Sequence, residues 1–246
     1  MEVKRAFTIA ELLIVLSIVG IIAQTTIPSL IQEQQERQTV TRLKKVYSML
    51  SSAYTLAAQA NGTPDNWGLS LTAPGLYQVL IKIKPYLSIS KDCSGGQSGC
   101  FAPGVGYKCL AHDDCPTEPF FYDTLGYATA QLSDNTLLYG TVSNVNCALD
   151  SGDGSFYNYI CGYYLVDING AIKPNVYGKD LFIFFLTKNG IFPAGAAQQT
   201  VNSFSIRCKN KNTQSGTGCA GWVIFNENMD YLHCNDLDWN IKNTCS

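Results

Sequence analysis

Hydrophobic and polar positions divide the chain into an apolar N-terminal segment, an amphipathic continuation and a longer mixed region. From Phe7 to Ile31 the residues are predominantly apolar, a run of about 25 residues that can cross a lipid bilayer as a helix. Between 32 and 62, apolar side chains recur every three or four positions, at Val40, Leu43, Tyr47, Leu50, Tyr54 and Ala57. The pattern predicts one long helix whose second half has a single apolar face and which stops at Asn61-Gly62.

The remaining residues, 63–246, predict a head of mixed helix and strand. Residues from about 67 to 162 are rich in Gly, Ser, Asn, Asp and Cys, which predicts a loop-rich insertion. Strand-like runs follow at 163–168, 181–186, 204–206 and 222–225, and Asn-Gly pairs at 169–170 and 189–190 indicate turns. We therefore predict an α+β fold: the second half of the helix packs on an antiparallel sheet, and the head carries disulfide-closed loops and a disulfide-closed tail within about 163–246.

Charge and cysteine content indicate the partners and the cellular compartment to expect for the head. The chain has 17 Lys and Arg against 19 Asp and Glu, for a net charge of -2, so nucleic acid is not an expected main partner. Its ten cysteines all lie beyond the first third of the chain, at Cys93, Cys100, Cys109, Cys115, Cys147, Cys161, Cys208, Cys219, Cys234 and Cys245. So many thiols indicate disulfides formed outside the cytoplasm. Sequence proximity favours the pairs 93–100, 109–115, 147–161, 208–219 and 234–245, although other connectivities stay open.

The residues around the start of the apolar run differ from an ordinary secretory signal. The basic residues Lys4 and Arg5 predict that the leader, residues 1–6, stays cytoplasmic while everything after Ile31 is exported. A secretory signal has its small residues after the apolar stretch, whereas here Ala6 comes before it. Glu11 lies inside the run, where an unpaired carboxylate costs roughly 2.5 kcal/mol or more, and this indicates a partner for its charge.

Residues 4–6 (KRA) and 7–16 (FTIAELLIVL) resemble the prepilin cleavage and methylation motif of type IV pilins and type II secretion pseudopilins. The resemblance implies that a prepilin peptidase cuts between Ala6 and Phe7 and methylates the new amino terminus, and that the apolar stretch remains as an anchor. It also implies that Glu11 pairs with the Phe7 amine of a neighbouring subunit and sets the register of assembly. The family usually has Gly before the cut, and this chain departs from it with Ala6.

The resemblance implies a structural subunit, a major or minor pilin. It would be inserted in the inner membrane with its head in the periplasm, then assembled by inner-membrane machinery with copies of itself or other pilins into an extracellular filament. A pseudopilin of a periplasmic type II secretion pseudopilus is one alternative. A filament-tip adhesin or ligand-binding minor pilin, whose Cys93–Cys161 region recognises a surface, a sugar or DNA, is another. A plain signal anchor whose Glu11 reaches toward the lipid headgroups also stays open.

Two residues of the apolar helix predict local weakness. Gly20 lowers helix propensity and Pro28 removes a backbone hydrogen bond, so together they would soften the helix for subunit packing and filament extension. The alternative is the general tolerance of membrane helices for these residues.

Candidate chemistry in the head is sparse. No nucleophile elbow, phosphate-binding loop or zinc-protease motif occurs, so we do not expect an enzyme or an obligatory cofactor. Cys109, His112 and Cys115 have zinc-ligand side chains but lack a fourth ligand, and a disulfide loop is the preferred interpretation. Asp167, Asn169 and Asp180 flank a glycine-containing turn that could bind calcium, against a turn held by its own side-chain hydrogen bonds. The aromatic residues could form a sugar-binding platform, but they are also typical of sheets and cores.

Overall fold

The computed structural model describes residues 8–72, 75–93, 100, 107–111, 128–148, 159–170, 172–197, 203–209 and 215–245. Its contacts divide the chain into two compact units, residues 1–38 and 39–246. The first contains the apolar part of helix α1, and the second contains the rest of that helix together with the sheet. The predicted amphipathic extension, which we began at residue 32, thus becomes part of the head unit from residue 39.

Helix α1 runs from Ile9 to Asn61 and continues without a break through Gly20 and Pro28. Its end matches the prediction from Asn61-Gly62. Gly62 has φ +75°, a left-handed conformation that only glycine adopts without strain, and this stops the helix. The Trp67 indole nitrogen then donates to the Gly62 carbonyl at 2.8 Å, which covers the end of the helix with a buried aromatic ring.

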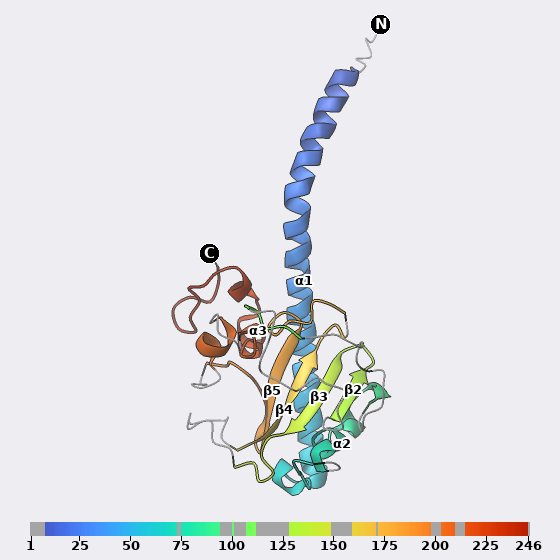
Figure 1. The fold of residues 1–246 in the computed structure, drawn as a ribbon, viewed down its shortest axis with the longest axis vertical. Helices are drawn as coiled ribbons and strands as arrows, with labels where there is room; N and C mark the ends of the chain where they lie inside the picture. Colours follow the sequence, from blue (N-terminus) through green and yellow to red (C-terminus); the bar gives the residue numbers. More distant parts are fainter. Residues whose placement is uncertain are drawn as a thin grey trace. The chain divides into compact units, whose positions relative to one another are not determined.

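The head contains one six-stranded sheet in which every neighbouring pair is antiparallel and the spatial order follows the sequence (Figure 1). The strands are β1 (Ile89–Asp92), β2 (Ala128–Leu132), β3 (Leu137–Val142), β4 (Ile160–Asp167), β5 (Leu181–Thr187) and β6 (Gly190–Pro193). The two strand-like runs expected at 163–168 and 181–186 correspond to β4 and β5. The two-residue connection from β5 to β6 is Lys188-Asn189, and β6 begins at Gly190, so the chain turns at the predicted Asn189-Gly190 pair. The Asn189 backbone N–H donates to Thr187 Oγ1 at 3.0 Å.

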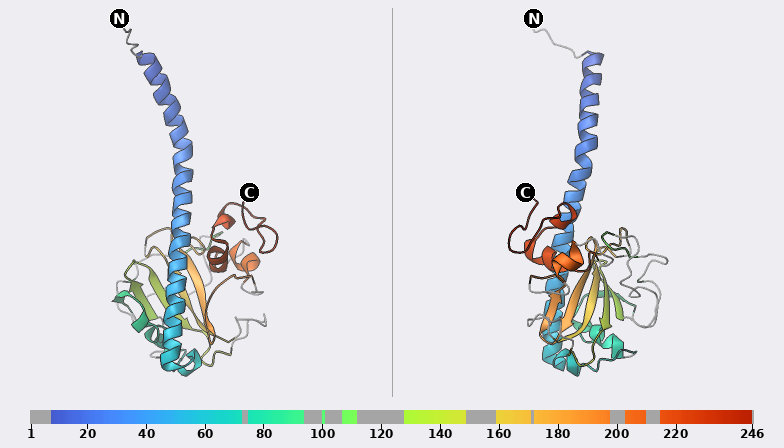
Figure 2. Two further views of the ribbon diagram at one scale, coloured as in Figure 1. Left: turned by 180° about the vertical axis from the view of Figure 1, so that it is seen from behind. Right: turned by 60° about the vertical axis from the view of Figure 1, so that its left-hand side comes forward.

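The part of α1 that belongs to the head unit lies across one face of this sheet, as the view from behind shows (Figure 2). Leu43 and Leu50 are fully buried in one cluster with Tyr164 and Val166 of β4. Tyr47 stacks on Phe184 of β5, with ring centroids 5.7 Å apart. The predicted packing of the helix on an antiparallel sheet is confirmed.

The opposite face of the sheet is also covered. Side chains alternate along a strand, so Leu165 points away from its neighbours Tyr164 and Val166 and enters a second buried cluster. The members of that cluster come from β3, β4 and β5, from the loop between β4 and β5 and from the cysteine-rich segments, and they are Cys93, Cys100, Cys109, Leu137, Tyr139, Leu165, Tyr177 and Leu181. Covering both faces explains why nearly every residue of β3 and β4 is buried.

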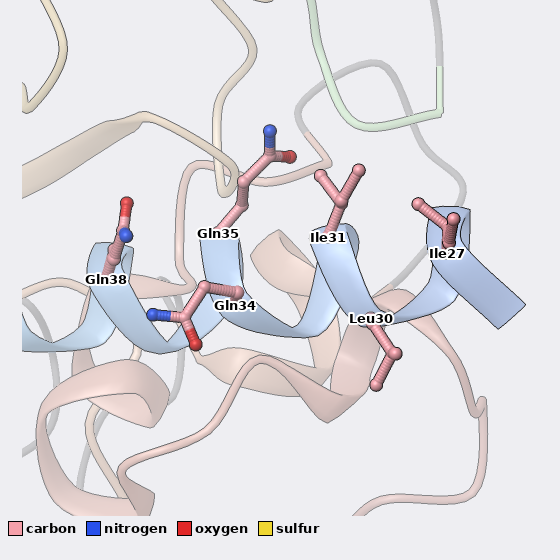
Figure 3. A pocket seen from close by; sticks show the side chains of 6 residues that line it. All are labelled: Ile27, Leu30, Ile31, Gln34, Gln35 and Gln38. Atoms are coloured by element: carbon pink, nitrogen blue, oxygen red, sulfur yellow. The ribbon is translucent and has the colours of Figure 1, made fainter.

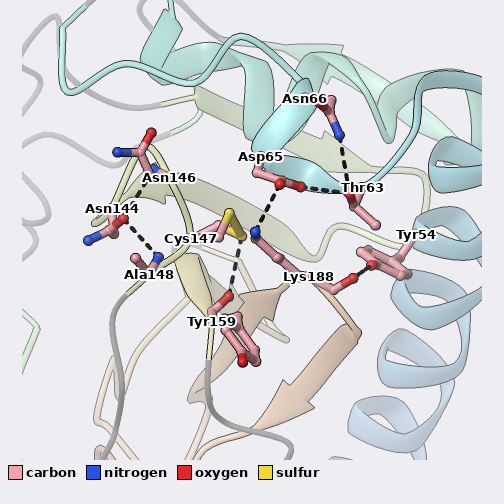
Figure 4. Close-up of polar contacts among 11 residues, drawn as sticks. Tyr54, Thr63, Asp65, Asn66, Asn144, Asn146, Cys147, Ala148, Tyr159 and Lys188 are labelled. Carbon is pink, nitrogen blue, oxygen red and sulfur yellow. Dashed lines mark hydrogen bonds and ion pairs between the residues drawn. A yellow bond between two sulfur atoms is a disulfide. The ribbon is translucent and has the colours of Figure 1, made fainter.

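A polar clamp joins the end of α1 to the β5–β6 turn (Figure 4). The Tyr54 hydroxyl donates to the Lys188 carbonyl at 2.6 Å, and the Lys188 ammonium pairs with the Asp65 carboxylate at 2.9 Å. Thr63 Oγ1 donates to the other oxygen of Asp65 at 2.6 Å. Burial and the negative charge of Asp65 raise the pKa of Tyr54 to about 12, so its hydroxyl remains a donor over the physiological range.

Two expected strands are wrong. Residues 204–206 belong to a π-helix, η4 (Phe204–Cys208), and residues 222–225 belong to helix α3 (Ala220–Asn226). Both runs are short and contain buried aromatic residues, Phe204 and Trp222, and a short run of this kind does not distinguish a strand from a helix. Phe204 and Trp222 stack with centroids 4.0 Å apart, so each helix forms the other's apolar contact.

The segment 67–162 holds more regular structure than we expected from its composition. It contains strands β1, β2 and β3, which form half of the sheet. Four short helices lie between α1 and β1, namely η1 (Pro64–Asn66), η2 (Gly75–Tyr77), α2 (Gln78–Ile81) and η3 (Lys84–Tyr86). A fifth, η5 (Asp230–Leu232), follows α3. The expectation of a loop-rich insertion was therefore incomplete. The three strands are short and separated by turns, so the turn residues dominate the composition of the segment.

Disulfides fasten the loops and the tail of the head. Four of the five pairs favoured by proximity are formed, Cys93–Cys100, Cys147–Cys161, Cys208–Cys219 and Cys234–Cys245. The fifth expected pair includes Cys115, which lies outside the described residues. Cys109 is itself disulfide-bonded. The α+β fold with disulfide-fastened loops is thus confirmed.

Candidate functional site

The first described residues of the chain form a capping box at the start of α1. Thr8 donates to Glu11 Oε2 through its backbone N–H at 2.8 Å and through its hydroxyl at 2.9 Å. In return, the Glu11 backbone N–H donates to Thr8 Oγ1 at 3.2 Å. The reciprocal pair satisfies donors at the start of the helix that have no carbonyl partner in the preceding turn. The spacing Thr-x-x-Glu at 8–11 is the sequence signal for this cap, and the interpretation of Glu11 as a charge in an apolar segment did not include it.

This capping box gives Glu11 a role in addition to the expected one of setting the register of assembly. Ala6 and Phe7, the predicted cleavage position, lie outside the described residues, so processing there stays a prediction. Among the described residues Glu11 forms no ion pair, and both Thr8 bonds reach the same carboxylate oxygen. A second charged or hydrogen-bonding group can therefore approach this carboxylate without replacing the cap.

The first unit exposes an unusual number of large apolar side chains. More than half of the surface of each of these side chains is accessible to solvent. They are Ile9, Leu12, Leu13, Ile14, Val15, Leu16, Ile18, Val19, Ile21, Ile22, Ile27, Leu30 and Ile31. The segment has a mean hydropathy of 2.0, and α1 is the one helix within the described residues that is long and apolar enough to span a membrane. A signal sequence has the same properties. Lipid or protein normally covers such a surface, and by length and composition the segment could serve as an anchor or as a signal.

The apolar surface ends in a shallow groove of about 380 Å³ on the side of α1 (Figure 3). Three aliphatic side chains and three amides line it, from Ile27, Leu30, Ile31, Gln34, Gln35 and Gln38. All six belong to one helix, so the groove is a feature of its surface and not an enclosed chamber. It marks the position where the helix changes from an apolar surface to one that can hydrogen-bond.

The polar groups of the β4–β5 loop form the other candidate site. Asp167 ends β4 and Asp180 precedes β5, and both are buried. Asp180 accepts hydrogen bonds from the backbone N–H groups of Asn175 at 2.7 Å and Val176 at 2.6 Å. Asn169 Nδ2 donates to the same carboxylate at 3.2 Å. The structure thus brings together the three residues that the sequence singled out, together with Asn175, which it did not.

Electrostatics at this loop are unfavourable for two ionised carboxylates. Burial and the neighbouring Asp180 charge raise the pKa of Asp167 to about 8. Burial also raises the pKa of Asp180, against the hydrogen bonds that lower it. The Tyr107 hydroxyl donates to Asp167 Oδ2 at 3.2 Å and lies 2.9 Å from the Tyr139 hydroxyl. Neither tyrosine supplies the positive charge that would stabilise both carboxylates.

The zinc interpretation is not supported. Cys109 is disulfide-bonded and offers no thiolate, while His112 and Cys115 lie outside the described residues. Within the part of the chain that is described, no group of three or more His, Cys, Asp or Glu side chains could hold a metal ion. Calcium also accepts amide oxygens, which are not among those side chains, so the calcium alternative stays open.

Comparison with known proteins gives little direct information. A family of unknown function, DUF6613, matches residues 29–74, which include most of α1 beyond the apolar segment and the turns that follow it. No curated protein and no solved structure matches the chain. The matched span covers the transition from the glutamine-lined groove into the head and does not include the motif around Phe7.

Proposed function

We propose that this chain is a structural subunit of a type IV pilus-like filament, a major or minor pilin that is inserted as a precursor and cleaved before Phe7. The proposal rests on one observation, the position of the KRA-FTIAE motif, residues 4–11, at the start of a helix with an exposed apolar surface. The disulfide-fastened head fits an extracellular or periplasmic location.

The apolar helix supplies both parts of such a role. In the precursor, lipid would cover its side chains, and in a filament the corresponding helices of neighbouring subunits would replace the lipid. The groove at Ile27–Gln38 lies at the end of this surface, where amides can form hydrogen bonds between helices. Because lipid and protein cover the same apolar area, the transfer from membrane to filament changes little in hydrophobic free energy, and polar contacts would decide its direction.

Glu11 would provide the decisive polar contact. A carboxylate in lipid costs roughly 2.5 kcal/mol or more, and the capping box with Thr8 offsets only part of that cost. Cleavage before Phe7 would create an ammonium that carries the opposite charge. Two buried charges are favourable only when they meet, so pairing of Phe7 with Glu11 of a neighbour would fix one register between subunits.

The proposal is tested by mass spectrometry of the intact chain and its N-terminal peptide, isolated from membranes and from sheared surface material of the native host. We expect a mature chain that begins with N-methylated Phe7 in the sheared fraction, and a full-length precursor in membranes. The same chain recovered only from the cell envelope would instead favour the pseudopilin alternative.

A matched variant controls for the cleavage motif. Phe7→Ala changes the residue at the predicted cut and should lead to accumulation of the precursor in membranes, whereas Val3→Ala in the leader should be processed normally. A chain that keeps Met1 in every fraction, or one cut after the apolar segment, would show a signal anchor or an exported head and would contradict the proposal.

A further inference from the structure

The chain contains three Asn-Gly pairs, at 61–62, 169–170 and 189–190, and the fold holds them with different firmness. Such a pair can react with itself, because glycine has no Cβ to keep its backbone nitrogen away from the preceding side-chain amide. The reaction requires the asparagine side chain to turn toward the backbone of the next residue. A pair therefore stays intact as long as hydrogen bonds and packing hold its side chain and backbone elsewhere.

The first pair is held at the end of α1. Asn61 Nδ2 donates to the Ala57 carbonyl at 3.0 Å, and Asn61 Oδ1 accepts from Lys82 Nζ at 3.2 Å. Both atoms of the side-chain amide are thus engaged. The side chain must give up two hydrogen bonds before it can approach the Gly62 nitrogen.

The second pair is held in the β4–β5 loop. Asn169 Nδ2 donates to the Asp180 carboxylate at 3.2 Å, and the Asn169 backbone N–H donates to Asp167 Oδ1 at 3.3 Å. The backbone that follows is enclosed as well, because a Cβ at Gly170 would lie 2.8 Å from the Asn135 carbonyl oxygen. Neither the side chain nor the backbone has room to rearrange without opening the loop.

The third pair lacks these restraints. Asn189 is exposed, and within the described residues its side chain has no hydrogen-bond partner. Gly190 pairs with Thr187 in the last rung of the β5–β6 ladder, and β6 is an edge strand of four residues. The end of a ladder opens more readily than its centre. An added Cβ at Gly190 would meet only the Phe192 ring, at 3.5 Å, so the backbone there is not enclosed.

We infer that Asn189 is a site of spontaneous deamidation in the folded chain, whereas Asn61 and Asn169 are protected from it. The Gly190 nitrogen attacks Asn189 Cγ, and a C–N bond forms as the bond from Cγ to Nδ2 breaks. Ammonia leaves with the proton that the Gly190 nitrogen loses. Water then opens the cyclic imide. Opening at the side-chain carbonyl gives aspartate, and opening at the backbone carbonyl gives isoaspartate, whose main chain runs through Cβ and Cγ.

Both products change the polar clamp at the end of α1 (Figure 4). Lys188, the preceding residue, accepts from the Tyr54 hydroxyl at 2.6 Å and pairs with Asp65 at 2.9 Å. A carboxylate at position 189 is one residue from the Lys188 ammonium and competes with Asp65 for it. Isoaspartate also adds a methylene to the backbone of the turn, so the Lys188 carbonyl must shift. The clamp would therefore loosen as the chain ages. This inference does not depend on the proposed filament function.

The test incubates the full chain in detergent micelles in mildly alkaline buffer and samples it over time. Peptide mass spectrometry follows the conversion of each amide to an acid, and chromatography separates aspartate from isoaspartate peptides. We expect Asn189 to convert faster than Asn61 or Asn169 by about tenfold or more, because those pairs must first break two hydrogen bonds. The same chain unfolded in urea gives the reference, in which all three pairs should react at similar rates.

Two variants connect the modification to the clamp. Asn189→Gln keeps an amide but forms the ring far more slowly, so its thermal unfolding midpoint should stay constant during an incubation that lowers the midpoint of the wild-type chain. Asn189→Asp carries the new charge without a longer backbone. Measured fresh, it should lower the midpoint less than isoaspartate does in the aged wild-type chain.

Three results would overturn the inference. One is an Asn189 that stays intact in the folded chain over a time that converts it in urea, which would mean that the turn protects it. Another is an equal rate at Asn61 or Asn169 in the folded chain, because the observed hydrogen bonds would then not decide the site. The third is an unchanged midpoint after conversion of Asn189, which would contradict the effect on the clamp.

Discussion

At the scale of single residues, Glu11 has two separable functions. Its carboxylate caps the first turn of α1 through Thr8, which is observed, and it would pair with a neighbour's amine, which is proposed. The cap requires only an acceptor at this position, whereas the pairing requires a negative charge. Glutamine therefore keeps the first function and loses the second, because its amide oxygen can still accept from Thr8.

This separation predicts different outcomes for three substitutions. Glu11→Gln and Glu11→Ala should both be processed at Phe7 and both assemble poorly, because neither carries the charge. Thr8→Val should weaken the cap by about 1 kcal/mol and still assemble, because Glu11 is unchanged. Processing is measured by intact mass, and assembly by the amount of chain in sheared surface material.

The comparison of Glu11→Gln with Thr8→Val is decisive. Normal filaments from Glu11→Gln would show that the charge does not set register. A loss of assembly in Thr8→Val equal to that in Glu11→Ala would show that helix capping, and not charge pairing, is what assembly needs.

At the scale of elements, the sequence predicted those whose signals are local. Gly62 stops α1 because its backbone conformation requires glycine, and the Asn-Gly pairs marked the turns around β4 and β5. Helix α3 was mistaken for a strand because Trp222 and Val223 are buried by η4 and the sheet, and a buried helix of seven residues shows no polar face. Burial by distant segments is not visible in a short apolar run.

The candidate sites divide in the same way. Asp167, Asn169 and Asp180 were recognised because they lie close together in sequence. Tyr107, which binds Asp167 from 60 residues away, was not, because only the fold brings it there. The capping box also has a local signal, since Thr8 and Glu11 are three residues apart, but the charge of Glu11 by itself does not reveal it.

The close packing of α3 on the chain at residues 194–196 predicts that replacing a helix glycine by alanine destabilises the head, the opposite of the usual effect. Gly221 N–H donates to the Ala194 carbonyl at 2.7 Å, and a Cβ at position 221 would lie 2.4 Å from the Ala196 backbone nitrogen. Alanine normally stabilises a helix by about 1 kcal/mol relative to glycine, but Gly221→Ala should lower the unfolding midpoint because backbone must move.

Gly20→Ala is its matched control, as nothing lies within 4 Å of an added Cβ there. It should leave the midpoint unchanged or raise it. Thermal unfolding of both variants in detergent micelles measures the difference, and an unchanged midpoint for Gly221→Ala would contradict the close packing of α3 against residues 194–196.

At the scale of the whole molecule, the two units differ in whether their apolar side chains are exposed or buried. The first exposes its apolar side chains, while the second buries both faces of its sheet and fastens its loops covalently. Within the described residues, the segments that cover the second face of the sheet, around Cys93, Cys100, Cys109 and Tyr177, contain little regular secondary structure. The disulfides compensate for this, because each restricts the unfolded chain and keeps a loop in place.

Their burial predicts an order of reduction. Cys147, Cys161, Cys208 and Cys219 are fully buried, whereas Cys234 is half-buried and Cys245 is exposed. A reductant under native conditions should therefore open Cys234–Cys245 first, with a small change in the unfolding midpoint. Reduction of the buried pairs should require denaturant and should then prevent refolding, because each is worth about 2–4 kcal/mol against a typical total of about 5–15 kcal/mol. Timed alkylation followed by peptide mass spectrometry gives the order, and thermal unfolding gives the effect. Early labelling of Cys147 or Cys208 would contradict the predicted order of reduction. An unchanged midpoint after complete reduction would mean that hydrophobic packing alone holds the head together.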